Sequence, residues 1–309
     1  MSDPEVYTLA DLGNWKEATR SLEFPARLAV IGDPVAHSRS PQMHNPALRA
    51  AGIAASYVRL HLRPEELAEG IAGMKEAGFV GFNVTIPHKS AVFEAVDDMS
   101  ETARRVGAVN TVAIEGGSLI GHNTDAPGLR RAVREAFSMD LRDLRIMIVG
   151  AGGGAGRGAA VQCAMDHCER LVLVNRTLEK ARELAAELRE VIHDPDRLEG
   201  PADRLVAIPW EERSMERELG QIDLIINATS LGMKRTDQEV VPRRLIQPHH
   251  LVYDMVYAPA RTRLMAEAEE EGAKAANGLG MLLWQGALAF EFWFNQPAPI
   301  EAMRAGLAG

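Results

Sequence analysis

The chain has 309 residues, of which 46% are hydrophobic and 25% are charged, enough to bury one large core or two smaller ones. Its 34 basic and 43 acidic residues give a net charge of −9, which argues against nucleic acid and anionic membranes as partners. No apolar run reaches the roughly 18 residues of a membrane span, and the amino terminus lacks the pattern of a signal peptide, so we expect a cytoplasmic protein.

The first hundred residues alternate strand and helix patterns, which predicts a parallel α/β domain. We place its first strand at residues 27–31 and expect residues 1–26 to be an extension outside the core. Further strands are predicted at 56–62 and 79–85, with helices that begin at Pro41 and Pro64. Ser40 is a natural N-cap for the first helix, but that leaves Ser38 unexplained. Two hydroxyls on the loop after a strand can together bind a carboxylate.

Several polar residues stand where ligand sites of open α/β sheets collect, just beyond predicted strand ends. Thr85 and Lys89 follow the third strand, Asn110 begins the next, and Asp125 opens a helix that runs to residue 137. Each also has a purely structural explanation. Lys89 can be a solvated surface lysine, and Asp125 can stabilise the positive end of its helix.

Residues 145–149 form a short apolar run that predicts a buried parallel strand, followed by a glycine loop and a helix. Gly150, Gly152 and Ala155 match the pattern G-x-G-x-x-A, in which the small residues allow a tight turn, a bound pyrophosphate and close helix packing. The alternative is a tight turn without a ligand. We predict a dinucleotide site at this loop, formed by Gly150, Ala151, Gly152, Gly153, Gly154 and Ala155.

The next strand, at residues 169–175, indicates which dinucleotide binds. An NAD-binding unit usually ends this strand with an acidic residue, whereas this chain has Asn175, Arg176 and Thr177. A guanidinium and a hydroxyl suit the 2′-phosphate of NADP, although Thr177 can also cap the following helix. Cys163 and Cys168 have no second pair of cysteines with which to bind zinc, so we predict no metal site.

The remaining pattern completes a second domain. Strands are expected at 205–208, 222–227 and 250–255, an exposed loop at 193–204, and a polar loop at 227–233 that can pass beneath a nicotinamide. A last apolar helix carries Gln285 and is expected to return to the first domain. The fold class is therefore α/β, with a parallel substrate domain at 27–122 plus about 279–309, and a Rossmann NADP-binding domain at 123–278.

The motifs together resemble those of the shikimate dehydrogenase family, including its quinate/shikimate dehydrogenase relatives, over residues 27 to about 300. The resemblance is carried by the segments 38–41, 83–89, 107–111, 123–125, 175–177, 254–257 and 285–286, together with the glycine loop. It departs from the family pattern at the glycine loop, which is one residue longer before Arg157, and at Ala258, where the family often has asparagine.

The resemblance implies an active site between a substrate domain and an NADP domain. Ser38, Ser40 and Tyr257 would meet the carboxylate of shikimate, while Thr85, Lys89, Asn110, Asp125 and Gln285 would meet its hydroxyls. It adds Thr229, Met255 and Gly278 to the expected cofactor contacts. The implied reaction is the NADP-dependent, reversible reduction of 3-dehydroshikimate to shikimate, a step of aromatic amino acid biosynthesis, with Lys89 and Asp125 as the proton-transfer pair.

Three alternatives remain at this point: a quinate-using dehydrogenase that takes NAD or NADP, a relative that senses the same ligand without chemistry, and an unrelated NADP enzyme of the same build. The paired serines and the missing acidic residue after Val174 favour shikimate and NADP. Retention of both Lys89 and Asp125 favours an enzyme over a sensor. We expect a small-molecule substrate, no nucleic-acid or membrane partner, and a monomer or homodimer.

Overall fold

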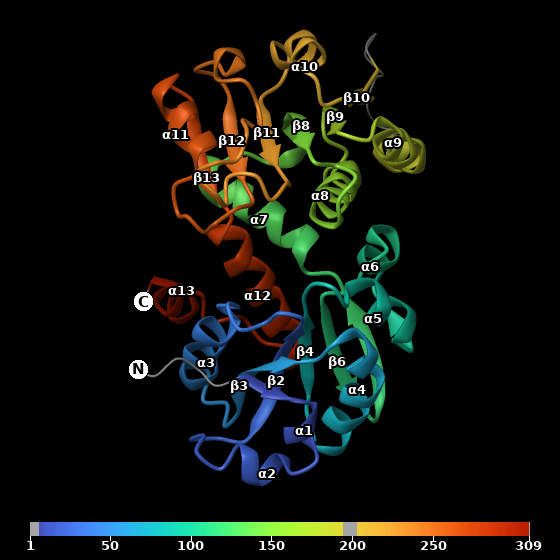
Figure 1. Cartoon of the computed structure of the whole chain (residues 1–309), viewed down its shortest axis with the longest axis vertical. Helices are drawn as coiled ribbons and strands as arrows, with labels where there is room; N and C mark the ends of the chain where they lie inside the picture. Colours follow the sequence, from blue (N-terminus) through green and yellow to red (C-terminus); the bar gives the residue numbers. More distant parts are fainter. Residues whose placement is uncertain (1–5, 194–202, 309) are drawn as a thin grey trace. The chain divides into compact units, whose positions relative to one another are not determined.

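The chain is described from a computed structural model, which covers residues 6–193 and 203–308 (Figure 1). It forms two compact units. The first comprises Met1–Thr124 and Gln285–Gly309, and the second is Asp125–Trp284. Nearly all of the loop expected at 193–204 lies outside the described residues.

The first unit is built on a seven-stranded sheet in the order β1-β3-β2-β4-β6-β7-β5. Its central strands β2, β3 and β4 are parallel, as expected, but β6 runs antiparallel to both β4 and β7. The difference arises at Gly116 and Gly117, which both have positive φ and so allow a two-residue hairpin turn between β6 and β7. The strands are β1 (Val6–Thr8), β2 (Ala26–Gly32), β3 (Ser56–His61), β4 (Gly81–Val84), β5 (Asp98–Met99), β6 (Thr111–Glu115) and β7 (Ser118–His122).

Helices cover both faces of this sheet; α3 and α13 lie to its left in Figure 1, and α4 and α5 to its right. Ser40 is the first residue of α3 rather than its N-cap, a position that Arg39 takes without a side-chain hydrogen bond. The Ser40 hydroxyl is therefore not used for capping. The helices are α1 (Leu9–Leu12), α2 (Trp15–Ala18), α3 (Ser40–Ala50), α4 (Leu67–Glu76), α5 (Lys89–Ala95), α6 (Glu101–Val106), α12 (Leu279–Phe294) and α13 (Ile300–Ala308), with a 3₁₀ turn at Pro64–Glu66.

The amino-terminal segment is part of the core, so the expectation of an extension up to residue 26 was wrong. Strand β1 pairs in parallel with β3. Trp15 is buried, with ring centroids 5.1 Å from Tyr7 and 5.2 Å from Phe79, and its indole N–H donates to the carbonyl of Ala26 at 3.2 Å. The strand was missed because three residues are too few to show an alternating hydrophobic pattern, and the single buried Trp15 adds no periodicity.

The last two helices return to the first unit, as expected. Residues from Gln285 onward belong to it, and α13 packs on α3. Arg39 donates to the carbonyl of Leu307. A Cβ at Gly306 would overlap the carbonyl oxygen of Gln42, and one at Gly286 would overlap Met43, so both helices approach α3 more closely than a side chain allows.

The second unit is a six-stranded, fully parallel sheet in the order β10-β9-β8-β11-β12-β13. Numbered within the unit, this is 3-2-1-4-5-6, the Rossmann order, with the order reversing between β8 and β11. The strands are β8 (Arg145–Val149), β9 (Arg170–Asn175), β10 (Leu205–Pro209), β11 (Leu224–Asn227), β12 (Leu251–Asp254) and β13 (Lys274–Asn277). The helices are α7 (Asp125–Phe137), α8 (Gly154–Met165), α9 (Leu178–Ile192), α10 (Glu212–Leu219) and α11 (Arg263–Glu270), with 3₁₀ turns at Leu141–Asp143 and Arg243–Leu245.

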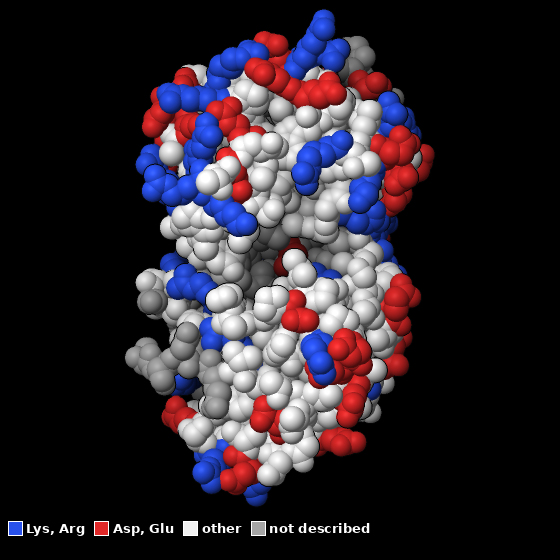
Figure 2. All heavy atoms as spheres, viewed as in Figure 1, with Lys and Arg blue, Asp and Glu red and all other residues white. Residues whose placement is uncertain are grey.

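The surface of the second unit carries many short ion pairs, and Figure 2 shows basic and acidic atoms interspersed over α10 and α11. Arg243 pairs with Glu270 and Glu271, and Arg244 pairs with Glu212 and Glu216. Exposed pairs of this kind each contribute between zero and about 1 kcal/mol. Within the described residues, no helix is both long enough and apolar enough to cross a membrane.

The buried position of Trp15 makes a testable prediction. Replacing Trp15 with alanine removes a packed aromatic ring, and we expect the free energy of unfolding of the first unit to fall by about 3–5 kcal/mol. Thermal melting followed by tryptophan fluorescence or circular dichroism measures the change. The matched control is Lys16→Ala, because Lys16 neighbours Trp15 in α2 but is exposed. Equal melting temperatures for the two variants would mean that this segment adds nothing to the core.

Candidate functional site

Ser38 and Ser40 lie beyond the carboxyl end of β2, at the point where the strand order of the first sheet reverses between β2 and β4. Their hydroxyl oxygens are 3.2 Å apart, and Ser38 donates to Ser40. The backbone N–H of Ser40 also donates to the Ser38 hydroxyl at 3.3 Å. The structure therefore brings together the two hydroxyls that the sequence predicted as a carboxylate-binding pair.

A buried arginine holds this loop, and the sequence analysis missed it. Arg59 in β3 is 2% exposed, and its Nε and Nη2 donate to the carbonyl of Ser38 at 2.9 and 2.7 Å. It also donates to the Gln42 side chain. The guanidinium therefore fixes the position of the Ser38 backbone. An arginine inside a predicted strand was the available signal, because a charged residue among buried neighbours requires a specific partner.

Asn110, a predicted substrate ligand, belongs to a buried polar cluster at the same edge of the sheet. Its side-chain oxygen accepts from the backbone N–H of Thr124 at 2.7 Å, and its amide donates to the Thr124 hydroxyl at 3.0 Å. Asn83 in β4 donates to the hydroxyl of Thr111 at 2.9 Å and to the carbonyl of Asn110 at 3.3 Å. Asn110 is 2% exposed, so its position is set from inside the protein.

Thr85, Lys89 and Gln285 complete the predicted substrate residues of the first unit. Thr85 follows β4, and a Cβ at Gly32 would overlap its methyl group, so a glycine is required where β2 ends. Lys89 is half-buried at the first residue of α5, and its carbonyl accepts from Val109 N. Gln285 is 8% exposed in α12 and precedes Gly286, the position where α12 packs closely on α3.

Asp125 and Tyr257 belong to the second unit. Asp125 is the first residue of α7 and directly follows Thr124, whose amide is bound by Asn110. Tyr257 is half-buried in the loop after β12. The pairing of Asp125 with Lys89 therefore stays a prediction from the sequence.

The glycine loop adopts the expected strand-to-helix turn, but with a different third small residue. Gly150 has φ +91°, and a Cβ there would lie 2.6 Å from the methyl group of Thr229. Ala155 is exposed, whereas Gly156 is buried, and a Cβ at Gly156 would overlap the carbonyl of Gly150. The residue that lets α8 pack on β8 is thus Gly156, and the role given to Ala155 in the G-x-G-x-x-A pattern was wrong. The extra residue of the loop explains the shift.

The hydrogen bonds of the loop indicate which amides remain for a phosphate. Gly150 and Ala151 donate to the carbonyl of Val174, and Gly153 donates to Gly150. Helix α8 begins at Gly154, and the N–H groups of a first helical turn have no acceptor within the helix. The amides of residues 154–156, at the positive end of α8, are therefore the ones that α8 leaves for an anion.

Asn175 and Thr177 lie beside this loop, as predicted. The Asn175 amide donates to the carbonyl of Thr177 at 2.9 Å, and a Cβ at Gly152 would lie 2.8 Å from the Asn175 Nδ2. The same Cβ would lie 2.9 Å from the Cβ of Lys180, an exposed cation that the sequence analysis did not select. Arg176 is exposed at the end of β9. Lys180 thus stands next to bare backbone, and Arg176 directly follows the end of β9; both cations suit a phosphate ester.

Thr229, Met255 and Gly278 are organised by buried residues at the ends of β11 and β12. Asn227 is fully buried, and its side-chain oxygen accepts from the N–H and hydroxyl of Thr229. Its amide donates to Asp254 at 2.9 Å. Burial raises the pKa of Asp254, although hydrogen bonds from Thr262, Val256 and Asn227 oppose this. A Cβ at Gly278 would overlap the Met255 carbonyl, so these two predicted residues are in contact.

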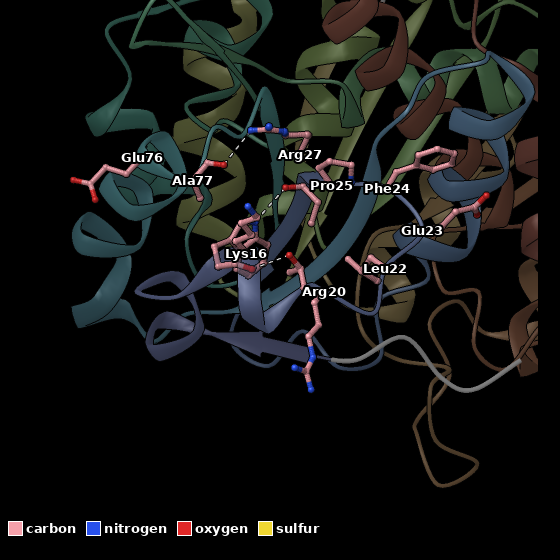
Figure 3. Close-up of a pocket in the computed structure, with 12 residues that line it drawn as sticks. Lys16, Arg20, Leu22, Glu23, Phe24, Pro25, Arg27, Glu76 and Ala77 are labelled. Carbon is pink, nitrogen blue, oxygen red and sulfur yellow. Dashed lines mark hydrogen bonds between the residues drawn. The ribbon is translucent and has the colours of Figure 1, made fainter.

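A separate pocket of about 600 Å³ lies in the first unit, where β2 begins and α4 ends (Figure 3). It contains none of the predicted site residues. Arg27 lines this pocket, and its guanidinium donates to the carbonyls of Ala77 and Gly78. Because ligands of open α/β sheets bind at the carboxyl ends of strands, this pocket at an amino end is not the candidate site. Among the described residues, no group of three or more His, Cys, Asp or Glu is arranged to hold a metal ion.

Three family models match the chain: a shikimate dehydrogenase substrate binding domain at residues 30–112, shikimate/quinate 5-dehydrogenase at 131–255, and a shikimate 5′-dehydrogenase C-terminal domain at 278–306. A shikimate dehydrogenase (NADP(+)) from Methanopyrus kandleri is 42% identical over 279 residues, which cover 90% of this chain and 93% of that protein. The chain belongs to the shikimate dehydrogenase family.

Solved structures agree with this assignment. A shikimate dehydrogenase in complex with NADP+ is 38% identical, with a TM-score of 0.82 and coverage of 91% of this chain and 94% of that one. A Thermus thermophilus shikimate 5-dehydrogenase in complex with NADP(H) and shikimate is 34% identical, with a TM-score of 0.79 and coverage of 92% and 98%. A quinate dehydrogenase from Corynebacterium glutamicum in complex with NAD is 28% identical, with a TM-score of 0.79 and coverage of 91% and 98%.

The glycine loop offers a matched pair of substitutions. A Cβ at Gly156 would overlap backbone, whereas one at Gly154, two residues earlier, meets nothing within 4 Å. We expect Gly156→Ala to displace α8 from β8, lowering the melting temperature and weakening NADP binding at least tenfold. Gly154→Ala should leave the melting temperature unchanged or slightly raised. Calorimetry with NADP and thermal melting measure both effects, and equal behaviour of the two variants would contradict the assignment of Gly156.

Proposed function

We propose that this protein is an NADP-dependent shikimate dehydrogenase that catalyses the reversible reduction of 3-dehydroshikimate to shikimate. The observation that carries the proposal is that the paired hydroxyls of Ser38 and Ser40 follow the carboxyl end of β2, while Lys89 begins α5 just after the carboxyl end of the neighbouring strand β4. These groups suit a ligand with a carboxylate and a reactive oxygen. The proposal includes a cytoplasmic location and a monomeric or homodimeric state, which rest on the sequence argument alone.

The substrate domain of the proposal is the first unit with its returning helices, residues 1–124 and 285–309, and the second unit is the NADP domain. Ser38, Ser40 and Tyr257 would bind the carboxylate of shikimate, and Thr85, Lys89, Asn110, Asp125 and Gln285 its hydroxyls. A buried polar group of the site that is left without its hydrogen-bond partner costs about 1–3 kcal/mol. A ligand that lacks one of the hydroxyls therefore binds more weakly, which gives such a site its selectivity.

The residues of the second unit fit NADP. Bare backbone at Gly150 and Gly152, the open amides at the start of α8, and Arg176 with Thr177 would hold the pyrophosphate and the 2′-phosphate. Thr229, Met255 and Gly278 would line the nicotinamide side. When bound, NADPH supplies the hydride that reduces the ring carbonyl.

Lys89 supplies the proton in this mechanism. Its ammonium Nζ donates a hydrogen bond to the carbonyl oxygen, stabilises the negative charge that develops there, and transfers the proton as the alcohol forms. In the reverse direction the neutral amine accepts the proton. The role of Asp125 is to orient the ammonium. Shikimate carries a single carboxylate, and neutral hydroxyls meet it at Ser38 and Ser40, so the charge of Lys89 remains available for the reacting oxygen.

A quinate dehydrogenase is the second candidate, because one of the three family models names quinate in its description and a related quinate dehydrogenase structure is in complex with NAD. The polar end of β9 favours NADP, since Asn175 and Arg176 stand where an NAD-binding unit has an acidic residue for the ribose hydroxyls, and a further cation, Lys180, follows in α9. A ligand sensor would have no use for a proton donor at Lys89.

The first test is nicotinamide reduction with shikimate or quinate, each combined with NADP or NAD. We expect turnover with shikimate and NADP, and a 10²- to 10⁴-fold loss of kcat in Lys89→Ala, because a positioned general acid contributes about that factor. Lys16→Ala is the control, since Lys16 is an exposed lysine of the same unit outside the site. Near-normal turnover in Lys89→Ala would exclude Lys89 as the proton donor, and binding without turnover in the wild type would favour a sensor.

Cofactor choice is tested at Arg176. We expect Arg176→Ala to raise KM for NADP by roughly ten- to a hundredfold, because a charge-assisted hydrogen bond to phosphate is worth about 1.5–3 kcal/mol. KM for NAD should change little, since NAD lacks the 2′-phosphate. Arg182→Ala, an exposed arginine on the following helix, is the matched control. An equal rise for both cofactors would place Arg176 elsewhere than at the 2′-phosphate.

A further inference from the structure

Tyr57 is a buried residue of the first unit that is hydrogen-bonded to the polar cluster around Asn110. It is 1% exposed in β3, and its ring stacks on His44 of α3, with centroids 4.4 Å apart and planes at 9°. Trp293 of α12 closes the cluster, 6.2 Å from Tyr57 and 5.5 Å from His44. Burial lowers the pKa of His44 to about 3, so the imidazole that stacks on the tyrosine ring is neutral. The ring of Tyr57 is therefore fixed by packing.

The Tyr57 hydroxyl has only one way to direct its proton. It lies 2.7 Å from the side-chain oxygen of Asn83. The Asn83 amide nitrogen faces the carbonyl of Asn110 and the Thr111 hydroxyl, and a carbonyl can only accept a hydrogen bond. The Asn83 oxygen must therefore be the atom that faces Tyr57, and Tyr57 must donate to it. Its own oxygen is left as an acceptor.

Ser40 lies on the same helix as His44. It is one helical turn before His44 on α3, so the two side chains lie on the same face of the helix. The Ser40 hydroxyl accepts from Ser38. Burial raises the pKa of Tyr57, so its hydroxyl stays protonated and can donate to Asn83.

The hydrogen bonds continue from Asn83 to the predicted substrate residue Asn110. Asn83 donates to Thr111, whose hydroxyl lies 3.0 Å from that of Thr124 and 3.2 Å from the Asn110 oxygen. Thr124 is the residue before Asp125. Tyr57 and Asn83 therefore belong to a buried network that ends at Asn110 and Thr124, and each of its members is 5% exposed or less.

We propose that Tyr57 is a positioning residue for substrate binding, which through Asn83 and Thr111 holds the Asn110 side chain where it meets a hydroxyl of the substrate. Tyr57 itself touches no substrate in this proposal. The inference rests on the proposed function, because that function assigns Asn110 to a hydroxyl of shikimate.

Tyr57→Phe tests the proposal, because it removes the hydroxyl and keeps the stacked ring. We expect KM for shikimate to rise roughly three- to tenfold, the effect of one lost internal hydrogen bond, with kcat within a factor of two and KM for NADP unchanged. In an Asn110→Ala background the same substitution should add little, because Tyr57 acts through Asn110. Tyr7→Phe is the matched control, since Tyr7 is a buried tyrosine of the same sheet outside this network.

The outcomes separate the two proposals. An unchanged KM in a folded Tyr57→Phe protein, or an equal rise with and without the Asn110 side chain, would overturn the positioning role. If Tyr57→Phe melts below the assay temperature, Asn83→Asp provides the second variant, and a KM for shikimate equal to that of the wild type would again overturn the inference. If the wild type does not turn over shikimate, the proposed function fails, and shikimate binding by calorimetry across the same variants still tests the network.

Discussion

The buried side-chain amides of Asn83 and Asn227 are the constraint on which both halves of the molecule depend. Asn83 is the last but one residue of β4, Asn227 is the last residue of β11, and each is 5% or less exposed, so its oxygen and nitrogen must find partners inside the protein. Asn83 binds Tyr57, Asn110 and Thr111, and Asn227 binds Thr229, Leu231 and Asp254. Because one amide bonds in several directions, it fixes the loops that leave neighbouring strands relative to each other. The predicted ligand residues stand on those loops.

Close backbone contact is the second means by which the chain shapes its sites. Gly32, Gly156, Gly278 and Gly286 each occupy a place where a Cβ would overlap a neighbouring residue. At three of these positions the glycine is next to a residue expected to bind ligand: Thr85, Met255 and Gln285. The missing side chain lets the segment that carries this residue approach the strand or helix behind it. The glycines therefore act on the geometry of the site without supplying a chemical group themselves.

Much of this was readable from the sequence, because strand ends, helix starts and charged loops produce local patterns. The strand at Arg145–Val149 and the helix at Asp125–Phe137 have the predicted bounds, and the two-unit α/β architecture and the return of the last helices were confirmed. The sequence did not show that Gly156, rather than Ala155, packs on β8. Both residues are small, and they differ only in how deeply each is buried at the start of α8. The roles of Tyr57 and Arg59 were only partly readable. The charge of Arg59 within a strand pattern indicates that it needs a partner, but the partners of both residues lie far along the chain and could not be identified.

The first unit is discontinuous in the chain, because residues 285–309 complete a structure that begins before residue 125. During synthesis on the ribosome, the first 124 residues emerge without Trp293, Gly286 and α13, which cover α3 and the ring of Tyr57 in the finished protein. The contiguous second unit has all of its strands as soon as residue 277 is made. The order of maturation is therefore the reverse of the order of translation: the cofactor half closes its core first, and the substrate half waits for the carboxyl terminus.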